Sequence, residues 1–426
     1  MKILFLSDNF PPETNAAATR VYERAVHWAK WGHEVTVITS FPNFPQGAIY
    51  PGYENKWYAV EEKDGIRVVR VKTFISANRG TLLRSLDFLS FLFTALPVAL
   101  VQPRFDVVAA TSPQFFAVVA GWLAGFLRRV PFVFELGDIW PASIIGVGVM
   151  RRNIGLIVLE KIELFLYRRS AAVASLTNAF KANLVGRGID PDKIAVVRNG
   201  VDLFRYAPRE RDADLAQAWG LSGRFVVGYV GTHGMAHGLI NVVEAAERLR
   251  HRPDICFLLV GDGADRPMLV EEARRRGLTN IVLQGPQPKE MMPRIWSLCD
   301  VALVHLRDSP VFAEVIPSKI FEAMGMGLPI LLASPRGEAQ EILEADRAGL
   351  WVPPGQPDAL AEAVARLKDT PNLRSGLAAT SHQASQLHSR RTQAMEMLQV
   401  LEITAAGWGN RAGLDVWAPI PHQQKR

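Results

Sequence analysis

The chain has 426 residues, of which 49% are hydrophobic and 21% charged, and it carries a formal net charge of +6. The apolar content excludes a disordered chain, and the length exceeds what one ordinary core needs, so we expect two globular domains. The charge is uneven: residues 1–206 hold 24 Lys and Arg against 17 Asp and Glu, a net of +7, whereas the remainder holds 24 against 25, a net of −1.

Three arginine pairs, at positions 128–129, 151–152 and 168–169, account for much of this basic character. They flank apolar stretches and do not alternate with exposed aromatic residues. This pattern favours an anionic membrane surface or a phosphate-bearing partner over nucleic acid. Solvated helix ends are the alternative interpretation of the same residues.

The first half of the chain alternates strand and helix patterns. It opens with the apolar run KILFLS (2–7), of the kind that parallel sheets bury on both faces, then a loop and a helical pattern over 20–32. The strand pattern HEVTVITS (33–40) completes a β–loop–α–β unit. Further strand patterns are IRVVRV, FDVVAAT, PFVFELGD and AAVASLT. The alternation predicts a doubly wound sheet.

One helical segment of the first half, LDFLSFLFTALPVALV (86–101), is unusually apolar. It is shorter than the about 20 residues that a spanning helix needs, and Asp87 and Pro97 interrupt it near its ends. Two interpretations stay open, a buried core helix and a helix that lies partly in a bilayer interface.

The second half repeats the alternation. The run FVVGYVG (225–231) leads into a Gly-rich loop and a helix, and the later strand patterns are ICFLLVGDG, IVLQG, DVALVHL and PILLAS. A charged segment with turn residues places the hinge near 200–215. We therefore predict an α/β protein with two Rossmann-like, doubly wound domains that face each other across a cleft, where a ligand binds at the strands' carboxyl ends.

The predicted domains are 1–204 and 205–377. An amphipathic helix over 378–405 would complete the first domain, and the tail 406–426, which has no periodicity, would be loose.

The two cysteines, Cys256 and Cys299, lie in apolar runs and are expected to be reduced core thiols, which fits a cytoplasmic protein. The opening MKILFLSDNFPPE has too short an apolar run for a signal peptide.

The loop GYVGTHGMAHG (228–238) follows a predicted strand and holds four glycines. Small residues there let the backbone approach a ligand, and the helix that follows offers unpaired amides to an anion. A tight turn without a ligand is the alternative. His233 and His237 have the spacing of a metal pair, but no Glu follows His233 and no third ligand is evident, so the sequence requires no metal. Imidazoles beside a phosphate are the better interpretation.

The segment FAEVIPSKIFEAMGMGLP (312–329) holds two glutamates eight residues apart, on either side of a predicted helix start. Pro317 disfavours helix for the residue before it, and Ser318 is a suitable N-cap. The first-turn amides and Lys319 then predict a diphosphate site. Glu322, one turn into the helix, is placed for vicinal hydroxyls such as those of a ribose, and Glu314 for the sugar.

With these residues in view, the chain resembles the retaining glycosyltransferases of family 4, which have the GT-B fold, over nearly all of residues 1–405. Glu314 and Glu322 match the E-x7-E motif of that family. Longer runs are similar to the N-acetyl-fucosamine transferases of O-antigen and capsule assembly, among them MKILFLSDNFPPETNAAATRVYE, HEVTVITSFPNFPQG and PSKIFEAMGMGLPI.

The resemblance implies a role for each matching residue. Glu314 would contact the donor sugar near its reactive centre and Glu322 the ribose. Residues 13–20, which include Asn15 and Arg20, would face the donor phosphates, and ELGDIWPAS (135–143) would line the acceptor side, with Asp138 and Trp140 as candidates. The diphosphate would be bound by Ser318, Lys319 and the loop residues Gly231, Thr232, His233, Gly234 and His237.

Two features depart from the family pattern. The Arg and Lys that many members carry after the first strand of the second domain are absent from GTHGMAHG, so His233, His237 and Lys319 would share the task of neutralising the diphosphate. The narrower group commonly reads ELRDLWPES where this chain has Gly137 and Ala142. This second departure leaves open which acceptor and which sugar the protein uses.

The expected function is transfer of a sugar from a UDP-sugar to a lipid-linked, polyprenyl diphosphate acceptor, by a protein peripheral to the inner face of the cell membrane. The leaving UDP would be stabilised by helix amides and cations, without a metal or other cofactor and with no nucleic-acid partner. Two alternatives remain, a nucleotide-sugar epimerase or phosphorylase and a donor-binding protein without turnover. A NAD-dependent dehydrogenase is disfavoured, because no G-x-G-x-x-G fingerprint follows the opening strand.

Overall fold

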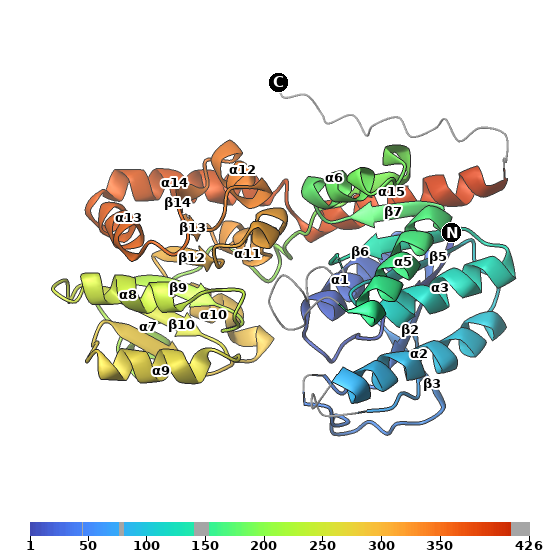
Figure 1. Ribbon diagram of the computed structural model, residues 1–426. Coiled ribbons are helices and arrows are strands. Elements are labelled where there is room, and N and C mark those ends of the chain that lie inside the picture. Colours follow the sequence, from blue (N-terminus) through green and yellow to red (C-terminus); the bar gives the residue numbers. More distant parts are fainter. Residues whose placement is uncertain (45, 76–80, 140–152, 410–426) are drawn as a thin grey trace. The chain divides into compact units, whose positions relative to one another are not determined.

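The computed structural model describes residues 1–44, 46–75, 81–139 and 153–409, which form two compact units (Figure 1). Unit 1 consists of Met1–Arg198 together with the chain from Gln393, and unit 2 is Asn199–Thr392. The chain therefore passes from one unit to the other after Arg198, a few residues before the predicted boundary at 204.

Unit 1 contains an eight-stranded sheet with the order β3-β4-β2-β1-β5-β6-β7-β8. Its strands are β1 (Lys2–Leu6), β2 (Glu34–Ser40), β3 (Tyr58–Lys63), β4 (Ile66–Val71), β5 (Val107–Thr111), β6 (Phe132–Leu136), β7 (Ala172–Ser175) and β8 (Ile194–Val196). All neighbours pair in parallel except β3 and β4, which form an antiparallel hairpin around Asp64 and Gly65. Both turn residues have positive φ, as a tight Asp-Gly turn requires.

Two layers of helices cover this sheet (Figure 1). The helices are α1 (Ala16–Lys30), α2 (Thr81–Val101), α3 (Phe115–Arg128), α5 (Ile154–Arg169), α6 (Asn178–Gly186) and α15 (Arg390–Gly409), with the short 3-10 helix η1 (Pro191–Lys193) before β8. Residues of α2, α3, α5 and α6 share one hydrophobic core with the sheet, and residues of α1 and α15 share the core on the other side. The nearly continuous apolar strands of the sequence are thus buried on both faces, as in other doubly wound sheets.

The predicted helix over 378–405 is two helices, α14 (Pro371–Ser385) in unit 2 and α15. The interruption has a backbone cause: the amide of Val201 donates to the carbonyl of His388, and the amide of Arg390 donates to the carbonyl of Val201. These bonds take groups that a continuous helix would need for itself. After the break, α15 is tied to α1 by the Trp28 indole, which donates to the Ala394 carbonyl over 2.8 Å.

Unit 2 contains a six-stranded, wholly parallel sheet with the order β11-β10-β9-β12-β13-β14. Its strands are β9 (Phe225–Val230), β10 (Ile255–Val260), β11 (Ile281–Gln284), β12 (Val301–His305), β13 (Ile330–Ala333) and β14 (Gly349–Val352). Its other helices are α7 (Ala213–Ala218), α8 (Ile240–Arg248), α9 (Arg266–Arg275), η2 (Lys289–Met291), α10 (Met292–Trp296), η3 (Pro310–Glu314), α11 (Lys319–Gly325), α12 (Glu338–Ala345) and α13 (Pro357–Asp369).

The core of unit 2 also lies on both faces of its sheet, with α10, α11 and α12 on one side and α8, α9 and α13 on the other. Gly228, in the middle of β9, shows how closely the layers pack. A Cβ at this position would collide with the Sγ of Cys299. Both cysteines are buried and free, and Cys299 uses the space that the glycine leaves.

The apolar segment 86–101 forms most of α2. This helix packs against α3 and buries one side, including Phe91 and Ala95, whereas Phe93 and Val101 on its other side are exposed. It is therefore a core-facing helix with an apolar outer edge, and its contact with a bilayer interface stays a prediction. Among the described residues, no helix is long and apolar enough to cross a membrane.

Candidate active site

The two glutamates of the E-x7-E segment lie in unit 2, after the carboxyl end of β12. Glu314 ends η3 and Glu322 lies in α11. The η3 turn packs directly on the backbone before α12, because a Cβ on Gly337 would overlap the carbonyl of Ala313. Glu322 accepts a hydrogen bond from the indole of the fully buried Trp296 over 3.3 Å. Packing and an indole donor thus fix the segment that carries both acids.

Ser318 does not cap the helix in the way the sequence predicted. Its backbone is already helical, with φ −58° and ψ −26°, its side chain is exposed, and its hydroxyl makes no cap hydrogen bond. The amides of Ile320 and Phe321 donate to the carbonyls of Pro317 and Ser318. Fewer first-turn amides are therefore available to an anion than the prediction assumed, so the neighbouring lysine carries more of that role.

Lys319 is the most unusual charged group of this unit. Its ammonium nitrogen is buried and has no hydrogen-bond partner among the described residues. It lies 3.7 Å from the centre of the Tyr229 ring, a cation–π contact. Burial lowers the pKa of Lys319 to about 7, although the nearby Glu322 acts in the opposite direction. A buried ammonium group without a hydrogen-bond acceptor costs free energy, and an anion could supply the acceptor.

Gly231 makes the room for this ammonium group. Its φ of +143° disfavours other residues, and a Cβ at this position would lie 2.9 Å from Lys319 Nζ. The Gly-rich loop after β9 and the lysine of α11 therefore meet, as the sequence predicted for a diphosphate site.

Tyr229 connects the parts of this site, and the sequence reasoning missed it. Its hydroxyl donates to the carbonyl of the exposed Thr232 over 2.7 Å. The centres of the His233 and His237 rings each lie 5.9 Å from that of Tyr229. The carbonyl of Gly234 accepts a hydrogen bond from the amide of His237. The tyrosine ring thus supports the whole loop, and its position as the last aromatic residue before a Gly-rich turn was the available signal.

Burial favours the neutral form of both histidines near pH 7, and their part in neutralising a diphosphate stays a prediction. Burial, followed by the cations Arg266 and Lys319, lowers the pKa of His233 to about 4. Burial and Lys319 lower the pKa of His237 to about 3. Neither group carries a proton near neutral pH, so they contribute hydrogen-bonding capacity and shape.

His305, at the end of β12, is a third buried histidine of the same region that the sequence did not single out. Its Nδ1 lies 2.6 Å from the carbonyl oxygen of His237, and its Nε2 lies 2.7 Å from Nδ2 of Asn241. Burial lowers its pKa to about 4. These contacts hold the β9 loop against the end of the neighbouring strand.

Arg266, at the start of α9, is a second cation of this region that sequence reasoning missed. It lies close enough to His233 to lower the pKa of that imidazole, and its Nη1 is buried without a partner among the described residues. The backbones approach closely here, since a Cβ on Gly263 would lie 2.5 Å from the His233 carbonyl oxygen. The glycines of VGDGADR (260–266) were the signal that could have pointed to it.

In unit 1, Arg20 is engaged in a buried ion pair. Its Nε lies 2.8 Å from Oε1 of Glu135, on β6, and its Nη2 donates to Thr111 over 3.0 Å. Arg24 contacts the same carboxylate oxygen over 2.5 Å. These two charges hold Glu135 ionised, with a pKa below its ordinary value despite complete burial. The structure thus uses Arg20 to join α1 to the sheet.

The remaining unit 1 candidates lie at the carboxyl ends of its strands. Asn15 caps α1, with its side-chain oxygen 2.9 Å from the Ala18 amide nitrogen, and its amide nitrogen is buried without a partner among the described residues. Asp138 follows β6, and its carbonyl accepts from the Ser112 hydroxyl. Trp140 and Ala142 lie outside the described residues.

Gly137 has a structural reason to be a glycine. A Cβ here would lie 2.5 Å from the Ser112 carbonyl oxygen and 2.8 Å from Nη2 of Arg20. The Arg20 guanidinium therefore occupies space beside the position where the resembling transferases carry their own arginine. A cation is kept in this region, but it comes from α1.

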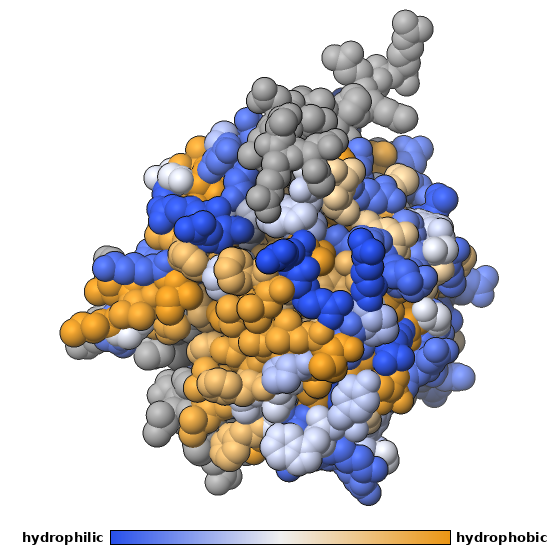
Figure 2. Space-filling view, turned by 90° about the vertical axis from the view of Figure 1, so that its right-hand side faces the viewer, coloured by the Kyte–Doolittle hydropathy of each residue, from blue (hydrophilic) through white to orange (hydrophobic). Residues whose placement is uncertain are grey.

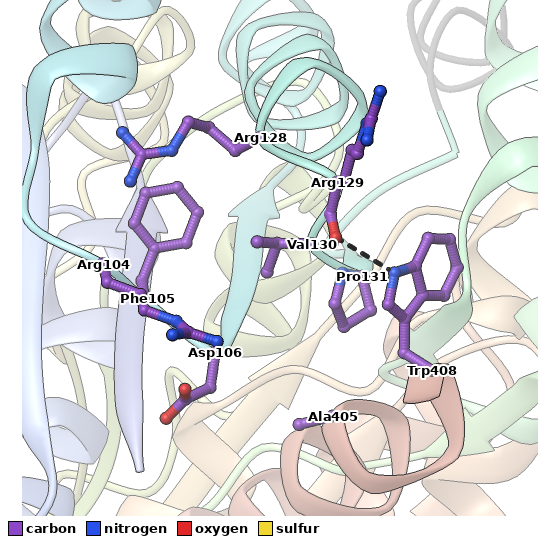
Figure 3. A pocket seen from close by; sticks show the side chains of 9 residues that line it. All are labelled: Arg104, Phe105, Asp106, Arg128, Arg129, Val130, Pro131, Ala405 and Trp408. Atoms are coloured by element: carbon purple, nitrogen blue, oxygen red, sulfur yellow. Dashed lines mark hydrogen bonds between the residues drawn. The ribbon is translucent and has the colours of Figure 1, made fainter. Parts of the chain in front are cut away.

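A hollow in unit 1 lies at the other edge of the sheet. It has a volume of about 510 Å³ and is lined by Arg104, Phe105, Asp106, Arg128, Arg129, Val130, Pro131, Ala405 and Trp408 (Figure 3). The first three residues precede β5, the four from Arg128 to Pro131 lie between the end of α3 and β6, and the last two belong to α15. The Trp408 indole donates to the Arg129 carbonyl over 3.2 Å. This hollow is therefore separate from the carboxyl-end residues described above.

No group of three or more His, Cys, Asp or Glu side chains able to hold a metal ion occurs in the part of the chain that the structure describes.

Two family models match the chain. The Glycosyl transferase 4-like domain matches residues 15–200, and Glycosyl transferases group 1 matches residues 224–370. The two matches fall on unit 1 and unit 2. The chain belongs to the family 4 glycosyltransferases of the GT-B fold. Its E-x7-E segment, Lys319 and the β9 loop lie within the second match.

Named relatives support this assignment. The chain is 26% identical over 337 residues to the Escherichia coli (strain K12) protein named for a colanic acid biosynthesis glycosyl transferase, WcaI, covering 77% of this chain and 82% of that protein. It is 26% identical over 361 residues to a GDP-mannose-dependent alpha-mannosyltransferase of Mycolicibacterium smegmatis, covering 82% and 84%. Among solved structures, Anabaena HepE in complex with UDP and glucose has the same fold, with a TM-score of 0.71, 20% identity and coverage of 94% and 99%.

The space around Gly137 gives a stability prediction. Gly137→Ala should lower the free energy of unfolding by about 1–3 kcal/mol, because the added Cβ overlaps the Ser112 carbonyl and displaces Arg20. Denaturant unfolding of both proteins measures this. Gly186→Ala, in α6 of the same unit with open space around it, is the matched control and should be neutral. Equal stability of all three proteins would contradict the close packing at Gly137.

The lowered pKa values of the histidines give a pH prediction for unit 2. These histidines have a pKa near 3 or 4 in the folded protein and 6.5 in the unfolded chain. At a pH between these values, each histidine is neutral when folded and takes up a proton on unfolding. The free energy of unfolding therefore falls as the pH falls through this range. His237→Asn should reduce the slope of unfolding free energy against pH by up to about 1.4 kcal/mol per pH unit. Hydrogen exchange of the β9 amides between pH 4 and 6.5 measures the slope. An unchanged slope would mean that His237 is not buried in its neutral form.

Proposed function

We propose that the chain is a retaining glycosyltransferase that moves a sugar, an N-acetylated deoxyhexosamine, from a UDP-sugar to a lipid-linked oligosaccharide in the synthesis of a surface polysaccharide such as O-antigen or capsule. The acceptor would carry a polyprenyl diphosphate, and the protein would act at the inner face of the cell membrane. Relatives named for colanic acid and teichuronic acid biosynthesis support a polysaccharide pathway. The UDP and glucose in the HepE complex favour a nucleotide-sugar donor.

The observation that carries this proposal is the buried, unpartnered ammonium group of Lys319. It stands between Gly231 of the β9 loop and the helix that carries Glu322. A diphosphate would supply the hydrogen-bond acceptors that the lysine lacks, and the glycine would let it approach the backbone. The hydroxyls of a ribose would then bind Glu322, and those of the sugar would bind Glu314.

The chemical step would depend on stabilising the leaving UDP. Negative charge grows on the bridging phosphate oxygen as the bond to the anomeric carbon breaks. Lys319 and Arg266 are the cations of unit 2 that would take this charge, in place of the neutral histidines. Retention of configuration fits a front-face attack, in which the departing phosphate oxygen takes the proton of the acceptor hydroxyl. Of the unit 1 candidates, Asp138 would bind the acceptor. The loop around Asn15 would contact the donor phosphates.

The transferase is tested by UDP release from a panel of UDP-sugars and GDP-mannose, with and without a lipid extract of bacterial membranes. We expect acceptor-dependent release from one UDP-sugar. Glu314→Ala should lower kcat by about 100-fold or more, since it removes a contact near the reacting centre. Glu271→Ala, an exposed glutamate of α9 in the same unit, is the matched control and should keep full activity.

Other outcomes of this assay identify the alternatives. Conversion of the donor sugar to an epimer without an acceptor would mean an epimerase. Tight UDP binding without turnover of any donor in the panel would favour a binding protein. Release from GDP-mannose alone would overturn the choice of uridine.

The pKa of Lys319 predicts how donor affinity depends on pH. The lysine is charged below its pKa of about 7, and a bound anion favours the charged form, so binding takes up a proton above that pH. Affinity for a UDP-sugar should fall by about tenfold per pH unit above 7, until the pKa of the complex is reached. A UDP-sugar is the right probe, because its diphosphate does not titrate in this range.

Calorimetry in two buffers of different ionisation enthalpy measures the proton uptake. Lys319→Arg keeps a charge at every pH and should remove the dependence, whereas Lys319→Met should weaken binding by about 10- to 100-fold at pH 6.5. Wild-type affinity that is constant from pH 6 to 9 would show that Lys319 does not bind the donor.

A further inference from the structure

The outward side of α5 in unit 1 is apolar along its length. Ile154 is 80% exposed and Val158 50%, and Ile157, Ile162 and Phe165 are also exposed. These positions repeat at three- and four-residue intervals, so they share one face of the helix. A helix on the surface of a globular protein ordinarily turns such a stripe toward the core. The face therefore has the pattern of a buried surface but is exposed.

This stripe continues onto α3. The ring of Trp122 lies 5.2 Å from that of Phe165 on α5 and 5.8 Å from that of Phe126, further along α3. Phe126 is 68% exposed and Leu127 54%. Figure 2 shows one face of the molecule, with a hydrophobic area beside hydrophilic residues. Continuous patches of this kind on a surface mark binding sites.

The acidic residues of α5 are held away from this stripe. Glu163 is buried and accepts a hydrogen bond from Tyr167, and both Glu163 and Glu160 pair with Arg187 on the side toward α6. Helix α3 contains no acidic residue. The charged side chains along the outward side of these helices are therefore cationic, with Lys161 in the middle of α5.

Arginine pairs lie where both helices end. Arg128 ends α3 and Arg129 follows it, and Arg168 and Arg169 end α5. Each helix connects two parallel strands, so each runs back from the carboxyl edge of the sheet and both end at the same opposite edge. Figure 3 shows Arg104, Arg128 and Arg129 around the hollow at that edge. The apolar stripe thus has a basic border at one end.

We propose that this surface, the α3–α5 face, seats unit 1 on an anionic lipid bilayer. Its apolar part comprises Phe126, Leu127, Ile154, Val158, Ile162 and Phe165, and its basic border comprises Arg129, Arg168 and Arg169. The Arg128 guanidinium instead donates hydrogen bonds to the carbonyls of Leu100 and Gln102. The apolar side chains enter the interface between headgroups and acyl chains, and the guanidinium groups bind lipid phosphates. The apolar centre disfavours a nucleic acid, which would need cations throughout. The inference rests on the proposed function in one respect, that a lipid-linked acceptor requires the enzyme at a membrane.

Vesicle sedimentation of the full chain tests the apolar part. The probes are vesicles of phosphatidylcholine alone and vesicles with about one-third phosphatidylglycerol. We expect binding to the anionic vesicles, and Ile154→Gln/Val158→Gln should weaken it by about tenfold or more. Phe204→Gln, which changes an apolar residue of unit 2 that is 98% exposed, is the matched control and should leave binding unchanged.

The same assay tests the basic border. Arg168→Gln/Arg169→Gln should weaken binding to anionic vesicles by about 25-fold, or about fivefold for each arginine, and should reduce its dependence on salt. The control Arg274→Gln/Arg275→Gln removes two exposed arginines from α9 in unit 2 and should have no such effect. Both α5 variants should keep the wild-type circular dichroism spectrum and unfolding midpoint, which shows that unit 1, the unit that carries α5, is folded.

Three outcomes would overturn the proposal: no binding of the wild-type chain to anionic vesicles, equal loss in the α5 variants and their controls, or a dimer that Ile154→Gln/Val158→Gln dissociates while vesicles are not bound. The proposed function fails separately. Sugar transfer to a short-chain acceptor in solution without vesicle binding keeps the function and rejects the α3–α5 face. Vesicle binding without sugar transfer keeps the α3–α5 face as a membrane-binding surface and rejects the proposed function.

Discussion

The buried ammonium group of Lys319 is the constraint on which the β9 loop and the start of α11 depend. A cation out of water and without a hydrogen bond costs free energy, and the protein meets that cost only in part, through the face of Tyr229 and the nearby Glu322. The residues around Lys319 fit the position and the charge of its ammonium group. A side chain at Gly231 would collide with the lysine, and burial, followed by the repulsion of the nearby cations, lowers the pKa values of His233 and His237. A bound anion would relieve all of these at once.

In unit 1, the buried carboxylate of Glu135 has charged partners. Glu135 is fully buried, and Arg20 and Arg24 neutralise it, so α1 is fixed to the sheet by charge-assisted hydrogen bonds. The same Arg20 fills the space beside Gly137. The Glu135 carboxylate is thus paired with two arginines within unit 1, whereas the Lys319 ammonium group has no hydrogen-bond partner among the described residues.

Departures from the family pattern can now be connected to particular contacts. The charges missing from the β9 loop correspond to Lys319 and to Arg266, whose Nη1 is also buried and unpartnered. At Gly137 the Arg20 guanidinium fills the space beside the glycine, and its charge is paired with Glu135.

The sequence by itself determined the alternating strands and helices of two α/β units, the Gly-rich loop after β9 and the E-x7-E segment, because apolar runs, glycines and proline act through local geometry. Tertiary structure decided the rest. The ionisation of His233, the internal pairing of Arg20, the break between α14 and α15 and the exposed side of α5 depend on residues distant in the chain. Burial and partner charge set them, and no local pattern carries that information.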